Sequence, residues 1–126
     1  MRPLILCIHM EKERALRLAF IAMSLGIAVK TTAPAQEGQT LAALCGLEDM
    51  KESVPAVRVE EEMLLLAFLP DDLTDRLLHA LRAAGLRVRL KAVLTPVNRA
   101  WNCGQLYREL AGEAAAFARQ MPKAES

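Results

Sequence analysis

Continuous apolar runs and helical apolar periods alternate along this chain. Residues 4–8 form an unbroken apolar run, which is typical of a strand buried on both faces. Residues 10–25 carry apolar side chains three and four positions apart, and this spacing predicts an amphipathic helix. Gly26 is placed to end that helix, and residues 27–32 are predicted to form the next strand. The beginning of the chain therefore predicts a strand, a helix and a strand.

A polar turn, a short helix and an acidic connector come next. Residues 34–39 are of turn-forming types, and residues 40–45 predict a helix that is closed by a glycine. Residues 48–62 are acidic and show no sustained apolar period. We expect this connector to be exposed, with a brief extended piece near Val57 and Val59.

The same order of patterns then repeats. Residues 63–69 form another unbroken apolar strand, and Asp71 or Asp72 is placed to cap the helix that follows. Gly85 is expected to end this helix as Gly26 ends the first. The apolar side of the helix consists of Leu73, Leu77, Ala80, Leu81 and Ala84.

One more strand and one more helix complete the repeat. Residues 86–94 alternate between charged and apolar side chains, which predicts a strand. Asn102 and Gln105 have the spacing of a capping box, so the last helix is predicted to begin at Asn102. The stripe that this helix should bury consists of Leu106, Leu110, Ala114, Phe117 and Met121.

The repeated order indicates two similar halves within one α/β domain. We expect half-repeats over residues 1–47 and 63–121, joined by the connector 48–62, to form one domain over residues 1–126. Internal duplication is the simplest origin of the halves, and independent repetition of a strand-helix pattern is the alternative. Either origin predicts four strands in one sheet.

The hydrophobicity of the strands limits their order. The first and third strands are apolar throughout, so we expect them at the centre of the sheet, with the second and fourth at the edges. A ferredoxin-like order 4-1-3-2 and an all-parallel order 2-1-3-4 both satisfy this condition. Arg87, Arg89 and Lys91 are predicted to share one face of the last strand, so helices should cover mainly the other side. The two-layer, α+β, ferredoxin-like arrangement is therefore preferred.

Composition narrows the classes of protein to consider. The chain has 126 residues, of which 53% are hydrophobic and 25% charged, with a formal net charge of +1. This balance argues against a disordered chain and against a globally basic nucleic-acid binder. The three cysteines, Cys7, Cys45 and Cys103, are far apart, which favours a reducing cytoplasm over a disulfide framework or a zinc site. Arg17 and Lys30 interrupt the longest apolar region, so we expect neither secretion nor membrane insertion.

The segment from Lys91 to Trp101 carries the most distinctive chemistry. Thr95 and Asn98 lie after the last strand, where α/β proteins tend to bind ligands, and both can donate hydrogen bonds. Lys91 or Arg99 is a candidate anion contact, and Trp101, the only tryptophan, is a candidate apolar wall. The competing interpretation is structural, with a tight turn at Asn98 and with Trp101 filling the core beneath the last helix.

Two further candidate sites rest on fewer residues. Cys103 lies in the first turn of the last helix, where the helix dipole lowers the pKa of a thiol, so an enzyme using Cys103 or His9 is one alternative. The charged stripe of Arg87, Arg89 and Lys91 makes weak RNA or anion binding a second alternative. A solvated strand edge gives the same charge pattern.

Metal binding is not predicted. No His, Asp, Glu or Cys residues cluster at the spacing of metal ligands. His79 follows Asp75 by four residues on a predicted helix, and an exposed ion pair is the expected role of these two side chains. We expect neither a metal ion nor a cofactor.

A resemblance to a known family rests on two consecutive motifs. The sequence KAVLTPVNRAW over residues 91–101, followed by LYREL over residues 106–110, resembles the signature of the bacterial DUF3783 family. Residues 64–85 resemble the same domain, and the N-terminal half, with residues 41–46, is similar to the region that commonly precedes it. Val97, Ala100 and the Cys103-Gly104 pair depart from the expected pattern.

The resemblance implies a bacterial cytoplasmic protein and no particular reaction. It focuses attention on Lys91, Thr95, Asn98 and Trp101. With the residue patterns, it favours a small non-catalytic binding or regulatory module whose small-molecule or anionic ligand lies near these side chains and Arg99. The first helix is apolar almost all round, so a homodimer is expected, whereas membranes and nucleic acid are not expected partners.

Overall fold

The four strands pair as one mixed sheet in the computed structural model, which describes residues 1–120, with side chains through Ala118. The order across the sheet is β2-β1-β3-β4. Within each half of the chain the two strands run parallel, and the halves meet where β1 and β3 pair antiparallel. The strands are β1 (Leu4–Ile8), β2 (Ala28–Thr32), β3 (Met63–Ala67) and β4 (Leu90–Val93).

Neither of the two predicted sheets is formed. The ferredoxin-like order 4-1-3-2 is wrong. The alternative has the observed order, 2-1-3-4, but its all-parallel direction is wrong because β1 and β3 run antiparallel, with Leu6 opposite Leu65. The central position of the first and third strands is confirmed. Strands that are apolar on both faces identify themselves as central, but their hydrophobicity carries no information about direction.

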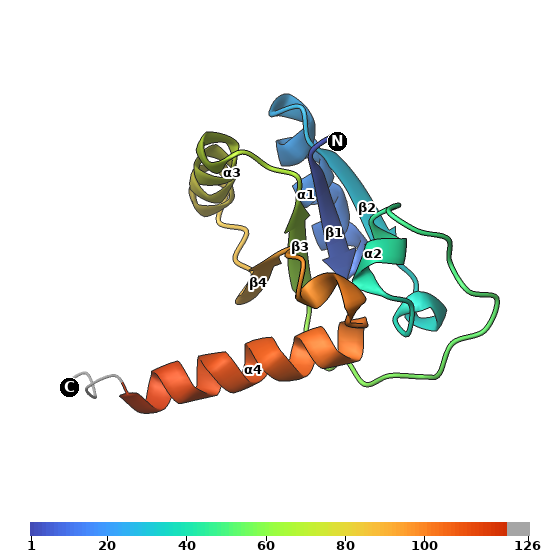
Figure 1. Cartoon of the computed structure of the whole chain (residues 1–126). Coiled ribbons are helices and arrows are strands. Elements are labelled where there is room, and N and C mark those ends of the chain that lie inside the picture. Colours follow the sequence, from blue (N-terminus) through green and yellow to red (C-terminus); the bar gives the residue numbers. More distant parts are fainter. Residues whose placement is uncertain (121–126) are drawn as a thin grey trace.

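Helices cover both faces of the sheet, so the predicted two-layer arrangement is also wrong. On one face lie α1 (Lys12–Ser24) and α3 (Asp71–Ala83), which contact each other. On the other face lie the short α2 (Leu41–Leu44) and the long α4 (Cys103–Gln120). In Figure 1, α1 lies behind the strands, whereas α2 and α4 lie in front of them. The result is a three-layer α/β architecture.

Alternate residues of the central strands supply two layers of core. Ile5 and Cys7 pack with α1 and α3 in what we term the α1/α3 core layer. Leu6 and Ile8 pack with α2 and α4 in the α2/α4 core layer. Complete burial of a leucine or isoleucine contributes about 1.5–3 kcal/mol, so both layers are needed to hold the sheet. That the whole chain forms a single domain stays a prediction.

The predicted helix ends are confirmed in part. Gly26 and Gly85 follow α1 and α3 with φ of +74° and +70°, the left-handed conformation that glycine adopts without strain. Asn102 and Gln105 form the capping box of α4 through exchanged hydrogen bonds of 2.9 and 3.0 Å. The cap predicted at Asp71 or Asp72 is wrong, because Pro70 precedes the helix and both aspartates lie in its first turn. There they face the positive end of the helix dipole.

The two halves also share an unusual backbone feature. His9 and Phe68 each lie just after the first strand of their half, and both have positive φ, at +57° and +65°. Non-glycine residues rarely adopt this conformation. The same turn thus follows β1 and β3, which agrees with the repeated pattern. Descent from one duplicated unit stays a prediction.

The predicted last strand is shorter than expected and changes face. Only residues 90–93 pair with β3, as β4. Leu86 and Val88 lie in the α1/α3 core layer, whereas Leu90 lies in the α2/α4 core layer. A single strand over residues 86–94, as predicted, would place these three side chains on one face. That prediction is wrong, because residues 86–89 precede the strand and do not share its pleat.

The connector over residues 48–62 contains neither helix nor strand, and it is not wholly exposed as was predicted. Val59 is buried in the α2/α4 core layer and Val57 packs against it. The side-chain amide of Gln39 exchanges two hydrogen bonds with the backbone of Lys51, at 2.7 and 2.9 Å. The connector is therefore held to the rest of the protein by Val57 and Val59 and by the hydrogen bonds of Lys51 with Gln39.

The predicted stripe of α4 is buried only near the start of the helix. Leu106 is buried, Leu110 and Ala114 are partly buried, and Phe117 is 63% exposed. Figure 1 shows the reason, since α4 extends well beyond β4, the strand that it contacts. Met121 lies outside the described residues.

Two glycines of α4 should respond in opposite ways to substitution by alanine. A Cβ atom at Gly104 would lie 2.8 Å from Val57 Cβ, whereas a Cβ atom at Gly112 would meet nothing within 4 Å. We expect Gly104→Ala to lower the free energy of unfolding by about 1–3 kcal/mol through overpacking. Gly112→Ala should raise it by about 0.8–1.0 kcal/mol through helix propensity. Urea unfolding measures both, and a Gly104→Ala variant as stable as the wild type would contradict the contact between connector and helix.

Candidate anion-binding groove

The loop that the sequence singles out is held together by its own side chains. Asn98 Oδ1 accepts a hydrogen bond from the Thr95 amide at 2.8 Å, and Thr95 Oγ1 accepts one from the Asn98 amide at 3.0 Å. Asn98 Nδ2 donates to the carbonyl of Val93, the last residue of β4, at 2.9 Å. Asn98 is buried, so its polar atoms are engaged in shaping the turn.

The rest of this loop is fastened to α2. The Trp101 carbonyl accepts a hydrogen bond from the Leu41 amide at 2.7 Å, and the Trp101 ring packs against the α2/α4 core layer. Arg99 is exposed. These contacts give Asn98 and Trp101 a structural part, and a ligand-binding part for Thr95, Asn98, Arg99 and Trp101 stays a prediction.

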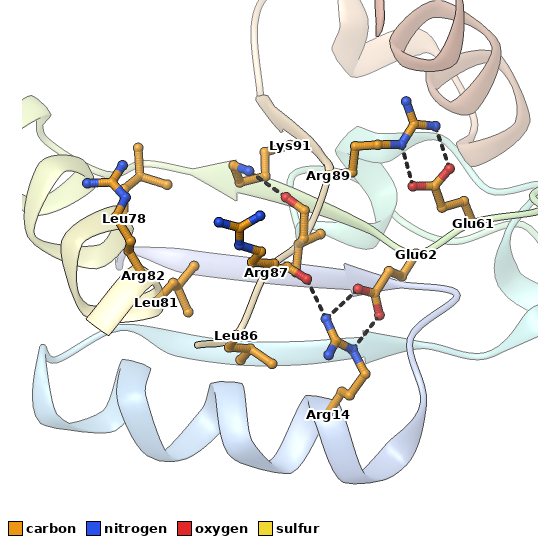
Figure 2. Close-up of a pocket in the computed structure, with 11 residues that line it drawn as sticks. Arg14, Glu61, Glu62, Leu78, Leu81, Arg82, Leu86, Arg87, Arg89 and Lys91 are labelled. Carbon is orange, nitrogen blue, oxygen red and sulfur yellow. Dashed lines mark hydrogen bonds and ion pairs between the residues drawn. The ribbon is translucent and has the colours of Figure 1, made fainter. Parts of the chain in front are cut away.

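Lys91 lies apart from that loop, in a groove on the face of α1 and α3. The groove has a volume of about 850 Å³ and is formed by side chains of α1, α3, the segment 86–89, β4 and the end of the connector. Figure 2 shows its walls. They consist of Arg14, Glu61, Glu62, Leu78, Leu81, Arg82, Leu86, Arg87, Val88, Arg89 and Lys91.

Two ion pairs build the side of the groove nearest the connector. Arg14 binds Glu62 through two hydrogen bonds of 2.9 and 2.6 Å, and also donates to the Arg87 carbonyl at 2.6 Å. Arg89 binds Glu61 in the same bidentate manner, with Nε donating at 2.8 Å. Such paired hydrogen bonds fix the planes of both groups. Both acidic residues of the groove are therefore already engaged.

Three cationic side chains of the groove have no acidic partner. Within the described residues, Arg82, Arg87 and Lys91 form no ion pair. Lys91 donates a hydrogen bond to the Val88 carbonyl. In Figure 2, Arg87 lies in the middle of the groove, with Arg82 at one end and the Arg14–Glu62 pair at the other. The groove therefore has an excess of positive charge over an uncharged floor.

That floor is aliphatic. Leu81, Leu86 and Val88 are buried members of the α1/α3 core layer, and Leu78 on α3 is half-buried beside them. The turn of the chain between residues 88 and 90 produces this arrangement, because it places Leu86 and Val88 beneath the same face on which Lys91 projects. Residues 86–91 thus supply part of the apolar floor and part of the cationic rim.

The sequence identified only part of this groove. Arg87, Arg89 and Lys91 stood out as a stripe, but they do not share a strand face, since only Lys91 belongs to β4. Arg14 and Arg82 lie on helices far apart in the sequence, and no local pattern marks them. The contact between α1 and α3 brings these two arginines to the same groove.

The thiols are poorly suited to catalysis. Burial raises the pKa of Cys103 to about 12, with a smaller contribution from the nearby carboxylate of Glu37. This direction is opposite to the lowering predicted from the helix dipole. Burial likewise raises the pKa of Cys7 to about 12 and that of Cys45 to about 11. A thiol in this state holds little thiolate at neutral pH.

His9 has a carboxylate neighbour and not a thiol. Its Nδ1 lies 3.5 Å from Oε2 of Glu37, a buried carboxylate oxygen that has no hydrogen-bond partner. The His9 side chain is 44% exposed. The ion pair predicted between Asp75 and His79 does not form in the described part of the chain.

Neither a metal-binding cluster nor a membrane-spanning helix is found between residues 1 and 120. No group of three or more His, Cys, Asp or Glu side chains is arranged to hold a metal ion. No helix in this part of the chain combines the length and hydrophobicity that crossing a bilayer requires.

Fold and groove together define a small α/β protein with a mixed four-stranded sheet, helices on both faces and a cationic, leucine-floored groove. Residues 62–117 match the family model described as Domain of unknown function (DUF3783). The family predicted from the motifs in residues 91–110 is thereby confirmed for the C-terminal half. The chain matches no curated protein and no solved structure.

Native thiol reactivity provides a test of the cysteine environment. Because all three cysteines are buried and their pKa values are raised, we expect very slow modification by a disulfide reagent at pH 7.5. In urea all three should react at once, which serves as the control. A single thiol that reacts rapidly in the folded protein, above all Cys103, would instead support an enzyme.

The Glu61–Arg89 pair should stabilise the protein in a pH-dependent way. Hydrogen bonds from Arg89 lower the pKa of Glu61. A lowered carboxyl pKa contributes stability above the unfolded pKa, about 4.3 for glutamate, and this contribution is lost as pH falls through the folded pKa. We expect Glu61→Gln to be less stable than the wild type at pH 7 in urea, with the difference shrinking towards pH 3. Glu113→Gln, on the exposed side of α4, is the control and should show no such trend.

Proposed function

We propose that this protein is a non-catalytic binding module that holds a small organic anion in the groove between α1 and α3. One observation carries the proposal: Arg82, Arg87 and Lys91 line the same groove, without acidic partners, over a floor of aliphatic side chains. Unpaired cations in a concave site favour an anion, and the floor favours an apolar group attached to it.

The groove suits a ligand of metabolite size. Its volume of about 850 Å³ falls in the range of small-molecule sites, roughly 300–1,000 Å³. The guanidinium groups of Arg82 and Arg87 offer bidentate hydrogen bonds, so phosphate or carboxylate is the favoured anionic group. Glu61 and Glu62, each occupied by an arginine, leave no free acidic group to recognise a cationic part.

A non-catalytic role agrees with the state of the reactive side chains. The carboxylates that line the groove are both locked in ion pairs, and the thiols are buried elsewhere with raised pKa values. General acid-base or nucleophilic catalysis needs a group that is free to exchange a proton or to attack. Three free, buried cysteines also support our proposal of a reducing, cytoplasmic location.

RNA is a poorer candidate than a small anion. No aromatic side chain lines the groove, whereas single-stranded nucleic acid is usually held by stacking on aromatic rings.

The loop of Thr95 and Asn98 has an indirect role in our proposal, because it does not contact the ligand. Its bond to the Val93 carbonyl holds the end of β4, and therefore the position of Lys91.

A fluorescent anion with an apolar body tests the groove directly. We expect 8-anilinonaphthalene-1-sulfonate to bind with enhanced fluorescence and to be displaced by salt. Arg87→Ala should weaken binding roughly 10-fold, the effect of losing one charge-assisted hydrogen bond. Arg76→Ala is the matched control, because this exposed arginine lies on α3 but does not line the groove.

The same titration distinguishes binding in the groove from binding elsewhere on the protein. Arg82→Ala and Lys91→Ala should each weaken binding, and Phe20→Ser, which removes an exposed aromatic ring on α1, should leave it unchanged. Equal binding by the Arg87→Ala and wild-type proteins, or loss of binding in Phe20→Ser alone, would contradict an anion site in the groove.

A further inference from the structure

One face of α1 presents three large apolar side chains to solvent. Leu16 is 57% exposed, Phe20 76% and Met23 71%. Their spacing of four and then three residues places them on one stripe of the helix. The buried side of α1 is formed instead by Ala15, Leu18 and Ala22. The fold therefore uses one side of α1 and leaves a second apolar stripe uncovered.

The exposed stripe faces away from the groove. Arg14 and Arg17, on the side of α1 next to α3, bind Glu62 and the carbonyl of Ala84. Leu16, Phe20 and Met23 are each more than half exposed among the described residues. A partner on this stripe would leave the groove open.

We propose that the stripe is a homodimer interface in which α1 packs antiparallel against α1 of a second copy of this chain. The helix runs from residue 12 to residue 24, so its midpoint is Leu18. An antiparallel partner with full overlap places Leu16 opposite Phe20 of the partner subunit, and Phe20 opposite the partner's Leu16. Leu16 and Phe20 thus complement each other across a two-fold axis, whereas Met23 lies opposite Glu13 of the partner subunit.

The charge of Lys12 favours the same arrangement. Lys12, exposed in the first turn, lies at the positive end of its own helix dipole, where a cation is unfavourable. The last turn of α1 carries no basic residue. Antiparallel packing brings Lys12 beside the C-terminal end of the partner's helix, which is negative. Each copy therefore supplies the cation that the other lacks.

The size of the stripe agrees with a modest dimer. A stable interface buries about 800 Å² on each partner. One aromatic side chain contributes about 150–250 Å² when buried, so Phe20 with its two apolar neighbours supplies a large part of that area. The remainder comes from the helix surface around them. Aromatic side chains at the centre of an interface commonly dominate its affinity.

The oligomeric state tests this proposal. Analytical ultracentrifugation of the wild-type protein over a wide concentration range should show a monomer-dimer equilibrium. Phe20→Glu and Leu16→Glu should each raise the dissociation constant at least about 10-fold. Phe117→Glu is the control, because Phe117 is equally exposed but lies on α4. Circular dichroism confirms that each variant is folded.

Cysteine pairs test the direction of packing without weakening the interface. A mixture of Lys12→Cys and Ser24→Cys proteins should form heterodimeric adducts with a short bismaleimide, whereas Lys12→Cys alone should not crosslink to itself. The native cysteines are buried and do not compete. A wild-type monomer at every concentration, dissociation by Phe117→Glu in place of Phe20→Glu, or Lys12→Cys self-crosslinking would each overturn the proposal. None of these results depends on ligand binding in the groove.

Discussion

The burial of β1 and β3 on both faces is the constraint from which the rest of the structure follows. Every residue of β3 is buried, and alternate side chains of each central strand enter different core layers. One layer of helices cannot cover such strands. The chain therefore needs α1 and α3 on one side and α2 with α4 on the other. The connector and the loop after β4 both pack against the α2/α4 core layer.

The groove lies where the segment between α3 and β4 does not extend the sheet. The segment between α3 and β4 is too irregular to extend the sheet, so Leu86 and Val88 fill the space beneath α3 without forming strand hydrogen bonds. The charged residues that alternate with them, Arg87 and Arg89, are exposed. Ion pairs from Glu61 and Glu62 restrain two of the cations and leave the others free. The irregular segment before β4 thus contributes both cationic and aliphatic side chains to the groove.

Sequence patterns predicted the elements better than their assembly. The glycine ends at Gly26 and Gly85, the Asn102 cap and the central strands all depend on local geometry or overall hydrophobicity, which residues reveal directly. Strand direction and layer number depend on how the halves meet, and no residue of β1 or β3 records that. Phe117 was predicted to be buried because its spacing fits the stripe, but spacing does not report where the sheet ends. Arg14 and Arg82 escaped notice for a related reason, since only tertiary contact unites them.

The pairing of Arg14 with Glu62 joins two parts of the chain that the family match separates. Arg14 lies in the N-terminal half, outside the matched residues 62–117, and Glu62 is the first of them. The matched segment excised alone would lose a wall of its groove and would expose the edge of β3 that β1 now covers. An unpaired apolar strand edge invites aggregation. The matched residues therefore do not include every part of the chain that builds the groove and covers β3.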